Sequence, residues 1–290
     1  MLLTGARGFT GKYVREELER AGYTVVGAIV GAAAGPHEVT LDITAPDNCR
    51  RVMEKVRPDY LVHLAAISFV QHADAEAFYR VNVIGTLNLL QAIADAGLSP
   101  RCVLVASSAN IYGNARADQI TEVQPPQPVN HYAVSKLAME HMVRTWSDRM
   151  PIVLTRPFNY TGVGQEPHFL IPKIVSHFVQ RAPVIELGNL DVERDFSDVR
   201  MVANAYRRLI EEAPAGEVFN ICSGRGHTLG GVLDMMSAIA GYAIDVRVNP
   251  AFTRANEVKR LVGSAEKLQK AVGQVATYPL ESTLDWMYNA

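Results

Sequence analysis

Five short apolar runs, rich in β-branched residues, recur along the chain with longer segments of helical spacing between them. The runs are TVVGAIV (24–30), YLVHLAA (60–66), CVLVA (102–106), PIVLT (151–155) and VFNIC (218–222). Strands of this kind are buried on both faces, and a helix-containing connection of about a dozen residues or more joins parallel strands. The alternation therefore predicts an α/β fold with a doubly wound parallel sheet that helices cover on both faces.

The pattern becomes less regular after residue 157. We expect a helix near 169–180, a short strand near 184, and a return to the sheet at 218–222. The loop-like segments at 31–38, 124–128 and 161–168 do not look like flexible interdomain linkers. The sequence thus predicts a first domain at residues 1–157 with a return segment at about 195–222, and a smaller interleaved C-terminal lobe at 158–194 and 223–290 that binds the substrate.

Composition excludes several classes of partner. The 290 residues are 48% hydrophobic and 20% charged, and a formal charge of −2 offers no basic field for nucleic acid. No window approaches the roughly 20 apolar residues of a membrane span, and no export signal precedes TGARG, so we expect a cytoplasmic protein. Cys49, Cys102 and Cys222 form neither a metal-ligand pattern nor an even disulfide set, so we expect no metal site and three reduced packing residues.

Three glycines follow a very short first strand and open an amphipathic helix in MLLTGARGFTGKYVREELERAG. They are Gly5, Gly8 and Gly11. A tight turn, a close approach to a pyrophosphate and close helix packing each require a residue without a side chain, and a helix N-terminus supplies free N–H groups. The spacing alone fits a simple turn equally well, but the order of strand, loop and helix favours a dinucleotide site in a Rossmann-like fold.

The choice between NADH and NADPH stays open in the sequence. The second strand ends in AIVGAAAG, with neither the acid that holds a ribose 2′-hydroxyl nor an arginine for a 2′-phosphate. Asp42 in LDITAPD fits a contact to the adenine edge, and it fits equally well a turn before a helix that begins near Pro46.

The segment HYAVSK places Tyr132 and Lys136 four residues apart, on one face of an expected helix. A neighbouring ammonium favours the ionised phenol, so we expect Lys136 to lower the pKa of Tyr132 and make it a general acid. Ser108 follows the strand at 102–106, at the carboxyl edge where open α/β sheets bind ligands, and can bond the same carbonyl oxygen. Taken alone, a Tyr and Lys pair at this spacing is more often a solvated helix face.

The combination of motifs resembles the extended short-chain dehydrogenase/reductase family. TGARGFTG, HLAA, SSANIYG, YAVSK and RPFN occur in the family's order across essentially the whole chain. The resemblance implies that Ser108, Tyr132 and Lys136 are the catalytic set, that Lys136 also holds the nicotinamide ribose, and that Asn82 supports the lysine. His131 is a departure, because many members have proline before the tyrosine. The cofactor contacts that the resemblance implies are Gly5, Gly8, Phe9, Thr10, Gly11, Asp42, Ile43, Leu64, Ala65, Ala66, Asn82, Tyr132 and Lys136.

The C-terminal half resembles those members of the family that act on GDP-linked deoxyhexoses. The likeness rests on RPFNYTGVGQ, GNLDVERDFSDV, NICSG and TRANEVKRLVGS. It implies a GDP-linked 4-keto-6-deoxyhexose as substrate, although it does not prove guanine over another base. The substrate contacts expected from it are Ser68, Asn110, Asn159, Lys173, Gly188, Asn189, Arg194, Arg254 and Glu257. Guanidinium groups suit phosphates, but Arg194 fits a surface ion pair with Glu193 or Asp195 as well, and Arg254 with Glu257 fits a surface pair.

The two residues after Ser108 distinguish reduction from dehydration. Related dehydratases carry an acid and a glutamate base at the next two positions, where this chain has Ala109 and Asn110. Neither side chain can transfer the protons that loss of water requires. We therefore expect NADPH- or NADH-dependent reduction of the C4 ketone, with the configuration of the product at C4 open.

Two other functions remain as alternatives. A nucleotide-sugar 4-epimerase uses the same three residues while it retains NAD+, and a regulatory subunit keeps the fold without activity, which the presence of Tyr132 disfavours. The resemblance also implies a homodimer through the helices near 75–97 and 131–148. Ala133, Leu137 and Met142 on the second helix fit that interface, or they face the sheet.

Overall fold

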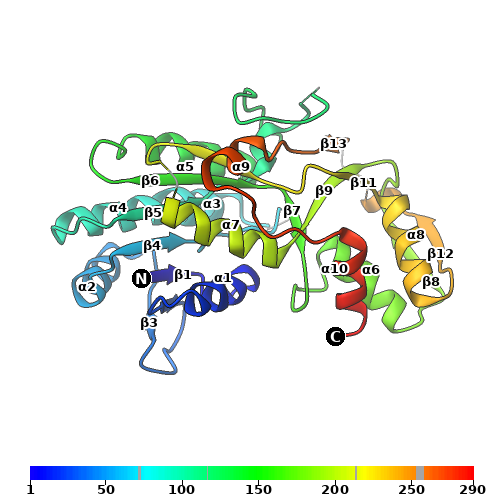
Figure 1. Ribbon diagram of the computed structural model, residues 1–290, viewed down its shortest axis with the longest axis horizontal. Helices are drawn as coiled ribbons and strands as arrows, with labels where there is room; N and C mark the ends of the chain where they lie inside the picture. The colour runs from blue at the N-terminus through cyan, green and yellow to red at the C-terminus, as the bar shows by residue number, and fades with distance from the viewer. Residues whose placement is uncertain (71–72, 116, 213, 253–257) are drawn as a thin grey trace.

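A computed structural model describes residues 1–290 apart from 71, 72, 116, 213 and 253–257. Its largest element is a parallel sheet of seven strands in the order β10-β6-β5-β4-β1-β2-β3 (Figure 1). The strands are β1 (Leu2–Thr4), β2 (Val26–Ile29), β3 (Glu38–Thr40), β4 (Tyr60–His63), β5 (Cys102–Ala106), β6 (Ile152–Pro157) and β10 (Val218–Ile221). The predicted Rossmann-like sheet is confirmed, because all five expected runs pair in it.

Helices cover both faces of this sheet. Helices α1 (Phe9–Arg20), α7 (Val199–Glu212) and α9 (Glu266–Val272) pack on one face, and α2 (Pro46–Val56), α4 (Thr86–Asp95) and α5 (His131–Arg144) pack on the other. Successive strand residues point to opposite faces, so Leu3 joins the core under α1 and α7 whereas Leu2 joins the core under α2 and α4. This arrangement explains why the central strands carry apolar residues on both faces.

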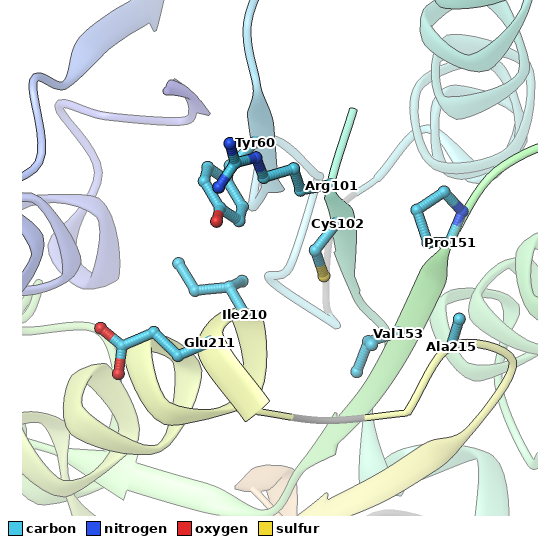
Figure 2. A pocket seen from close by; sticks show the side chains of 8 residues that line it. All are labelled: Tyr60, Arg101, Cys102, Pro151, Val153, Ile210, Glu211 and Ala215. Atoms are coloured by element: carbon cyan, nitrogen blue, oxygen red, sulfur yellow. The ribbon is translucent and has the colours of Figure 1, made fainter. Parts of the chain in front are cut away.

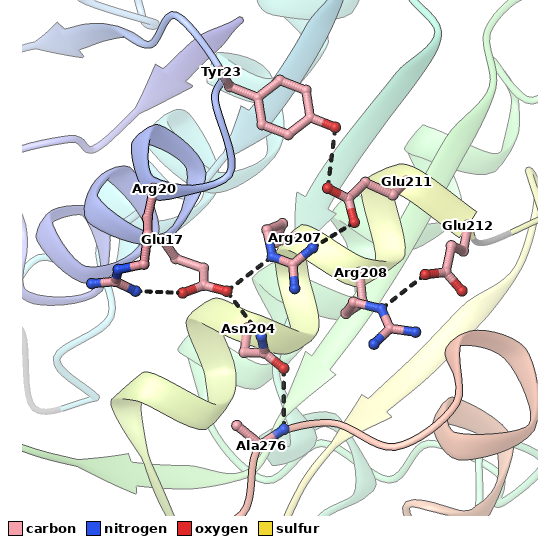
Figure 3. A network of polar contacts seen from close by, with 9 residues as sticks. All are labelled: Glu17, Arg20, Tyr23, Asn204, Arg207, Arg208, Glu211, Glu212 and Ala276. Carbon is pink, nitrogen blue, oxygen red and sulfur yellow. Dashed lines mark hydrogen bonds and ion pairs between the residues drawn. The ribbon is translucent and has the colours of Figure 1, made fainter.

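Charged side chains hold α7 against α1 (Figure 3). Glu17 of α1 accepts hydrogen bonds from Arg207 and Asn204 of α7, both at 2.9 Å. Arg207 also pairs with Glu211, which accepts a bond from the Tyr23 hydroxyl. These bonds keep the pKa of Glu17 below its usual value despite the opposing effect of partial burial. The network fixes the helix that follows the glycine loop to a helix that lies 180 residues further along the chain.

A second, smaller lobe lies at the carboxyl end of the large sheet, on the right of Figure 1. Strand β9 (Glu193–Asp198) pairs with β7 (Asn159–Thr161), β11 (Gly226–Thr228) and β13 (Arg260–Leu261). A separate pair joins β8 (Val184–Leu187) to β12 (Asp245–Val248), and a third core lies among α6 (Leu170–Val179), α8 (Leu229–Ala240) and α10 (Leu280–Tyr288). Helix α9 lies in the stretch expected for this lobe, but its Leu268 and Val272 pack in the first core with α7.

The helix expected near residues 75–97 has an irregular middle. It begins as α3 (Ala75–Tyr79), widens into a π-helical turn, η1 (Arg80–Gly85), and continues as α4. Turns of this kind are rare and frequently occur at functional sites. Asn82, one of the expected cofactor residues, lies in the turn and is buried.

The three cysteines are free and buried, as predicted. Ala133 is buried, and Leu137 and Met142 are half-buried against cores of this chain, while the homodimer interface stays a prediction. No helix in the part of the chain that the structure describes has the length and apolar character needed to cross a membrane.

Candidate active site

The three expected catalytic residues meet at the carboxyl edge of the large sheet. Ser108 follows β5 and caps the short helix η2 (Ala109–Tyr112). Helix α5 begins beside it because the Asn130 side chain accepts a hydrogen bond from the Ala133 amide, 2.8 Å away. Tyr132 and Lys136 face inward from the first two turns of α5 and are 7% and 5% exposed. The alternative reading, in which they form a solvated helix face, is wrong.

Ser108 is held as a hydrogen-bond donor. Its Oγ accepts from both the amide and the side-chain Nδ2 of Asn110, each at 3.1 Å. These two bonds use both lone pairs of the hydroxyl, so its proton is left to donate. Asn110, expected as a substrate contact, therefore orients Ser108 in this structure. The donor of Ser108 is directed to Tyr132, with which it shares a hydrogen bond.

The pKa of Tyr132 differs from the expectation. Burial raises the pKa of its phenol to about 12, and the hydrogen bond with Ser108 opposes this only in part. The predicted lowering by Lys136 is wrong, because burial of the phenol dominates the shift and the group that opposes it is Ser108. Tyr132 is therefore fully protonated at neutral pH, which suits a group that gives a proton away.

Lys136 is anchored by the main chain. Its Nζ donates to the carbonyl oxygen of Ala106, 2.8 Å away at the end of β5. Burial lowers the pKa of the ammonium to about 8, although the carboxylate of Glu140, one turn further along α5, acts in the opposite direction. Glu140 itself is fully buried and pairs with Arg156 of β6 at 2.7 Å. Lys136 consequently keeps most of its charge near pH 7.

The glycine loop lies beside this edge and has the tight geometry of a phosphate cradle. Gly5 has a φ of +69°, which favours glycine, and a Cβ on Gly11 would lie 2.1 Å from the carbonyl oxygen of Gly5. Gly8 stands at the N-terminus of α1, and no side chain caps that end. The first amides of the helix therefore remain available to an anion. A dinucleotide diphosphate fits this arrangement.

A pocket of about 240 Å³ continues from the loop along the ends of β1 and β2. Its lining includes four expected cofactor residues, Gly5, Gly8, Ile43 and Ala65. It also includes Arg7, the only charged side chain among these lining residues, which was not among the expected cofactor contacts. Arg7 makes a two-pronged ion pair with Glu38 of β3, at 2.7 and 3.1 Å. The ion pair of Arg7 with Glu38 depends on the pairing of β3 with β2, and no short sequence motif predicts that pairing.

The other expected cofactor residues lie around the same loop. Phe9 stacks on Tyr160 of β7, with ring centroids 6.1 Å apart, and the Thr10 hydroxyl lies 2.7 Å from the Tyr160 hydroxyl. Asp42 accepts hydrogen bonds from the amide and the hydroxyl of Thr44. Of the two roles considered for Asp42, the turn is therefore present. The amides of Leu64 and Ala65 donate to the Thr4 hydroxyl, and Ala66 follows them half-buried.

Asn82 reaches the catalytic helix by a different contact from the one expected. Its Nδ2 donates to the Ser135 hydroxyl at 3.0 Å, and Ser135 donates to the carbonyl oxygen of Tyr132 at 2.7 Å. The Asn82 side chain also bonds both main-chain groups of Ile67. It thus links the turn after β4 to the first turn of α5.

Part of the expected substrate set gathers in the second lobe. The Lys173 ammonium lies 4.5 Å from the ring centre of Phe252, in helix η3 (Pro250–Phe252), and donates to the Glu186 carbonyl oxygen. A Cβ on Gly188 would approach the Phe252 carbonyl oxygen at 2.8 Å, and Asn189 shapes the following turn by accepting from Asp191. These contacts bring Lys173 and Gly188 together at Phe252.

The other expected substrate residues that the structure describes are Ser68, Asn159 and Arg194. Ser68 is exposed after β4, and Asn159 is exposed on β7. Arg194 donates to the carbonyl oxygens of Glu193 and Lys259, at 2.9 and 3.2 Å, and so ties β9 to the segment before β13. Arg254 and Glu257 lie outside the described residues.

A second cavity of about 280 Å³ opens at the opposite, amino edge of the sheet (Figure 2). It is lined by Tyr60, Cys102, Pro151 and Glu211, among others. Burial raises the pKa of the Cys102 thiol to about 12, so it holds no nucleophilic thiolate at neutral pH. This cavity is separate from the catalytic edge.

Comparison with known proteins agrees with the geometry. A sequence model of the NAD dependent epimerase/dehydratase family matches residues 1–222. GDP-6-deoxy-D-talose 4-dehydrogenase of Aggregatibacter actinomycetemcomitans is 39% identical over 274 residues, which cover 94% of this chain and 91% of that protein. GDP-6-deoxy-D-mannose reductase of Pseudomonas aeruginosa is 32% identical over 302 residues, covering 99% and 96%.

Solved structures show the same fold. The structure of RMD from Pseudomonas aeruginosa complexed with NADPH has a TM-score of 0.87 at 31% identity and covers 99% of this chain and 97% of its own. A candidate epimerase from Burkholderia cenocepacia J2315 has a TM-score of 0.92 at 50% identity, with coverage of 99% and 96%. The resemblance drawn from the motifs therefore extends over the whole chain.

Proposed function

The chain belongs to the NAD-dependent epimerase/dehydratase family, and from that premise we propose that it reduces the C4 ketone of GDP-4-dehydro-6-deoxy-D-mannose with NAD(P)H. The product is GDP-D-rhamnose or its C4 epimer, GDP-6-deoxy-D-talose. The observation that carries the proposal is a protonated, buried Tyr132 bonded to Ser108, one turn before Lys136. The names of the two curated relatives support the GDP-linked 6-deoxyhexose.

The side chains divide the reduction between them. NAD(P)H, when bound, supplies the hydride that reaches the ketone carbon. Ser108, whose lone pairs are filled by Asn110, donates to the ketone oxygen as negative charge develops on it. Tyr132 gives its phenolic proton to that oxygen, and the Lys136 ammonium stabilises the phenolate that remains.

Dehydration does not fit the same site. Ala109 is buried and has no group that transfers a proton, and the Asn110 amide is engaged by Ser108. The site therefore offers an acid for the ketone oxygen without a base for the neighbouring carbon. Simple reduction is the reaction that this set of groups supports.

The pocket beside the glycine loop supports NADPH as the preferred cofactor. Val30 stands where an acid would bind a free ribose 2′-hydroxyl, and Arg7 is the charged residue in the lining. A guanidinium suits a phosphate, and Glu38 holds it in place by the two-pronged pair. We expect Arg7 to bind the 2′-phosphate of NADPH.

The remaining expected contacts are part of the proposal. Gly5, Gly8 and Gly11 would hold the diphosphate of the cofactor, and Lys136 the nicotinamide ribose. Lys173, Gly188, Asn189 and Arg194, with Arg254 and Glu257, would hold the GDP moiety in the smaller lobe. The three free cysteines support a cytoplasmic location, and Ile84 and Val134 are the exposed apolar side chains that a homodimer through the η1 and α5 surfaces would cover.

Oxidation of NADPH on GDP-4-keto-6-deoxymannose, generated in place by a separate dehydratase, tests the proposal. We expect one NADPH consumed for each sugar reduced, and the coupling constant of the new C4 proton will identify the epimer. The alternative is a 4-epimerase, which the family description and the Burkholderia structure favour. An epimerase would convert nucleotide sugars without added reductant and would carry tightly bound NAD+ through purification.

A further inference from the structure

His63 is a buried titratable side chain that the proposed reaction does not use. It lies at the end of β4, between the glycine loop and the π-helical turn, and is 4% exposed. Its Nδ1 lies 2.8 Å from the Thr4 hydroxyl, and its Nε2 lies 2.9 Å from the Thr86 hydroxyl. Burial, with a smaller effect of the Lys136 charge, lowers the pKa of the imidazole to about 3, so the ring is neutral.

The contact with Thr4 determines whether Nδ1 of His63 carries a proton. The Thr4 hydroxyl already accepts from the amides of Leu64 and Ala65, both at 3.1 Å. Its two lone pairs are then used, so its proton must go to His63. Nδ1 of His63 is therefore the acceptor, and the proton of the neutral ring resides on Nε2.

The Thr86 end leads to the same assignment independently. The Thr86 hydroxyl donates to the carbonyl oxygen of Asn82 at 2.8 Å, and a carbonyl can only accept. Thr86 must therefore accept from His63, which again places the proton on Nε2. Two separate counts of donors and acceptors thus agree on one tautomer.

The bonds continue from Asn82 to the catalytic helix. Its Oδ1 accepts from the Ile67 amide at 2.9 Å, which fixes the orientation of the side-chain amide, and its Nδ2 donates to Ser135. The Ser135 hydroxyl in turn donates a hydrogen bond to the carbonyl oxygen of Tyr132. Each hydrogen bond from Thr4 to the first turn of α5 therefore has one assigned donor and one assigned acceptor.

We propose that His63 is a positioning residue. Through Thr86 and Asn82 it determines the position of Tyr132 relative to the glycine loop. The chain of bonds joins the strand that opens the phosphate cradle to the helix that carries the catalytic phenol and ammonium. It thereby fixes the distance between the loop that would hold the diphosphate and the helix whose Lys136 would hold the nicotinamide ribose. Fully satisfied buried networks of this kind rigidify the groups that they connect.

The competing reading is that His63 only fills space between β4 and the helix. Both readings predict that removal of the bonds destabilises the protein. Only the positioning role predicts slower chemistry in molecules that are fully folded, because a small displacement of a reacting group lowers the rate by as much as about a hundredfold. The inference rests on the proposed reductase function for its kinetic test.

A matched pair at Thr86 separates these readings. Thr86→Val keeps the shape but removes the hydroxyl, and we expect kcat for NADPH-dependent reduction to fall at least about tenfold, with KM for the sugar within about twofold. Thr86→Ser retains the hydroxyl and should recover most of kcat. Thr283→Val is the control, since Thr283 is equally buried but bonds Asp198, which takes no part in the chain of bonds from Thr4 to α5. It should lower the melting temperature and leave kcat unchanged.

The tautomer itself is measurable without turnover. Long-range ¹H–¹⁵N correlation spectra of the imidazoles, with His63→Gln to assign the signal, should show His63 neutral with its proton on Nε2 from pH 6 to 8. A proton on Nδ1, or a charged ring in this range, would overturn the proposal, as would Thr86→Val with the kcat of the wild type. An inactive wild-type protein would instead count against the proposed function, and the spectra would still decide the direction of the bonds.

Discussion

The Lys136 ammonium donates to the Ala106 carbonyl oxygen over 2.8 Å, which ties the catalytic helix to the last residue of β5. Ser108 follows Ala106 by two residues, so the same contact fixes the serine relative to the tyrosine one turn before the lysine. A lysine in this position is removed from water, and its charge depends on the surrounding protein.

The pH dependence of the reaction should follow this lysine. Burial lowers the pKa of Lys136 to about 8, so its charge is present below that pH and is lost as the pH rises through it. We expect kcat/KM to be level from pH 6.5 to 7.5 and to fall above about pH 8, since this parameter reports the free enzyme. A profile that stays level to pH 10 would show that Lys136 has an ordinary pKa or no role.

The phenol of Tyr132 should be essential to the rate. Tyr132→Phe removes the proton donor and leaves the ring packing, and we expect kcat to fall by about 10²- to 10⁴-fold. Tyr242→Phe is the matched control, because Tyr242 lies in the second lobe and bonds the Phe178 carbonyl oxygen. Equal circular dichroism spectra and cofactor binding in both variants would assign the loss to chemistry. Native turnover by Tyr132→Phe would refute the assignment.

Arg7 should determine the preference for NADPH. Arg7→Ala removes the charge in the pocket, and we expect kcat/KM for NADPH to fall by about tenfold or more, as for loss of hydrogen bonds to a charged group, while that for NADH changes little. Glu38→Gln keeps the side-chain shape but removes the charge that pairs with Arg7, and the preference for NADPH should persist or increase. An equal loss with both cofactors would mean that Arg7 supports the loop rather than the 2′-phosphate.

The buried pair of Glu140 and Arg156 should dominate the stability of the catalytic helix. Arg156→Met leaves the fully buried Glu140 carboxylate with its longer pair to Arg144, at 3.5 Å, and we expect the free energy of unfolding to fall by about 3 kcal/mol. Adding Glu140→Met should recover most of that loss, because two apolar side chains replace two charges. Arg15→Met breaks an exposed pair with Glu19 and should cost less than about 1 kcal/mol. Urea titration measures all three differences.

Much of this arrangement could be predicted from local sequence. The large sheet followed from apolar runs, because a strand buried on both faces leaves a strong signal. Strand β5 has the bounds expected for it. Strands β7, β11 and β13 did not leave such a signal, since each has at most three residues and takes its pairing from β9. The π-helical turn at Asn82 was likewise absent from any motif.

The electrostatics of the site could not be predicted from spacing. The spacing of Tyr132 and Lys136 correctly placed both side chains on one face of α5. The direction of the pKa shift of Tyr132, however, depends on burial, which the surrounding fold determines. Arg7 belongs to the glycine loop itself, but its ion pair with Glu38 forms because β3 lies beside β2. Tyr160 meets Thr10 across 150 positions of sequence. Such contacts belong to the tertiary structure.

Transfer of a labelled hydride tests the proposed reaction most directly. NADPH deuterated at C4 of the nicotinamide is supplied with GDP-4-keto-6-deoxymannose, and the purified sugar is examined by ¹H and ²H NMR. We predict deuterium at C4 of the hexose, in a GDP-6-deoxyhexose of a single configuration, with one NADPH oxidised for each label incorporated. Absence of NADPH oxidation, together with conversion of unreduced nucleotide sugars by enzyme-bound NAD+, would contradict the reductase and establish an epimerase.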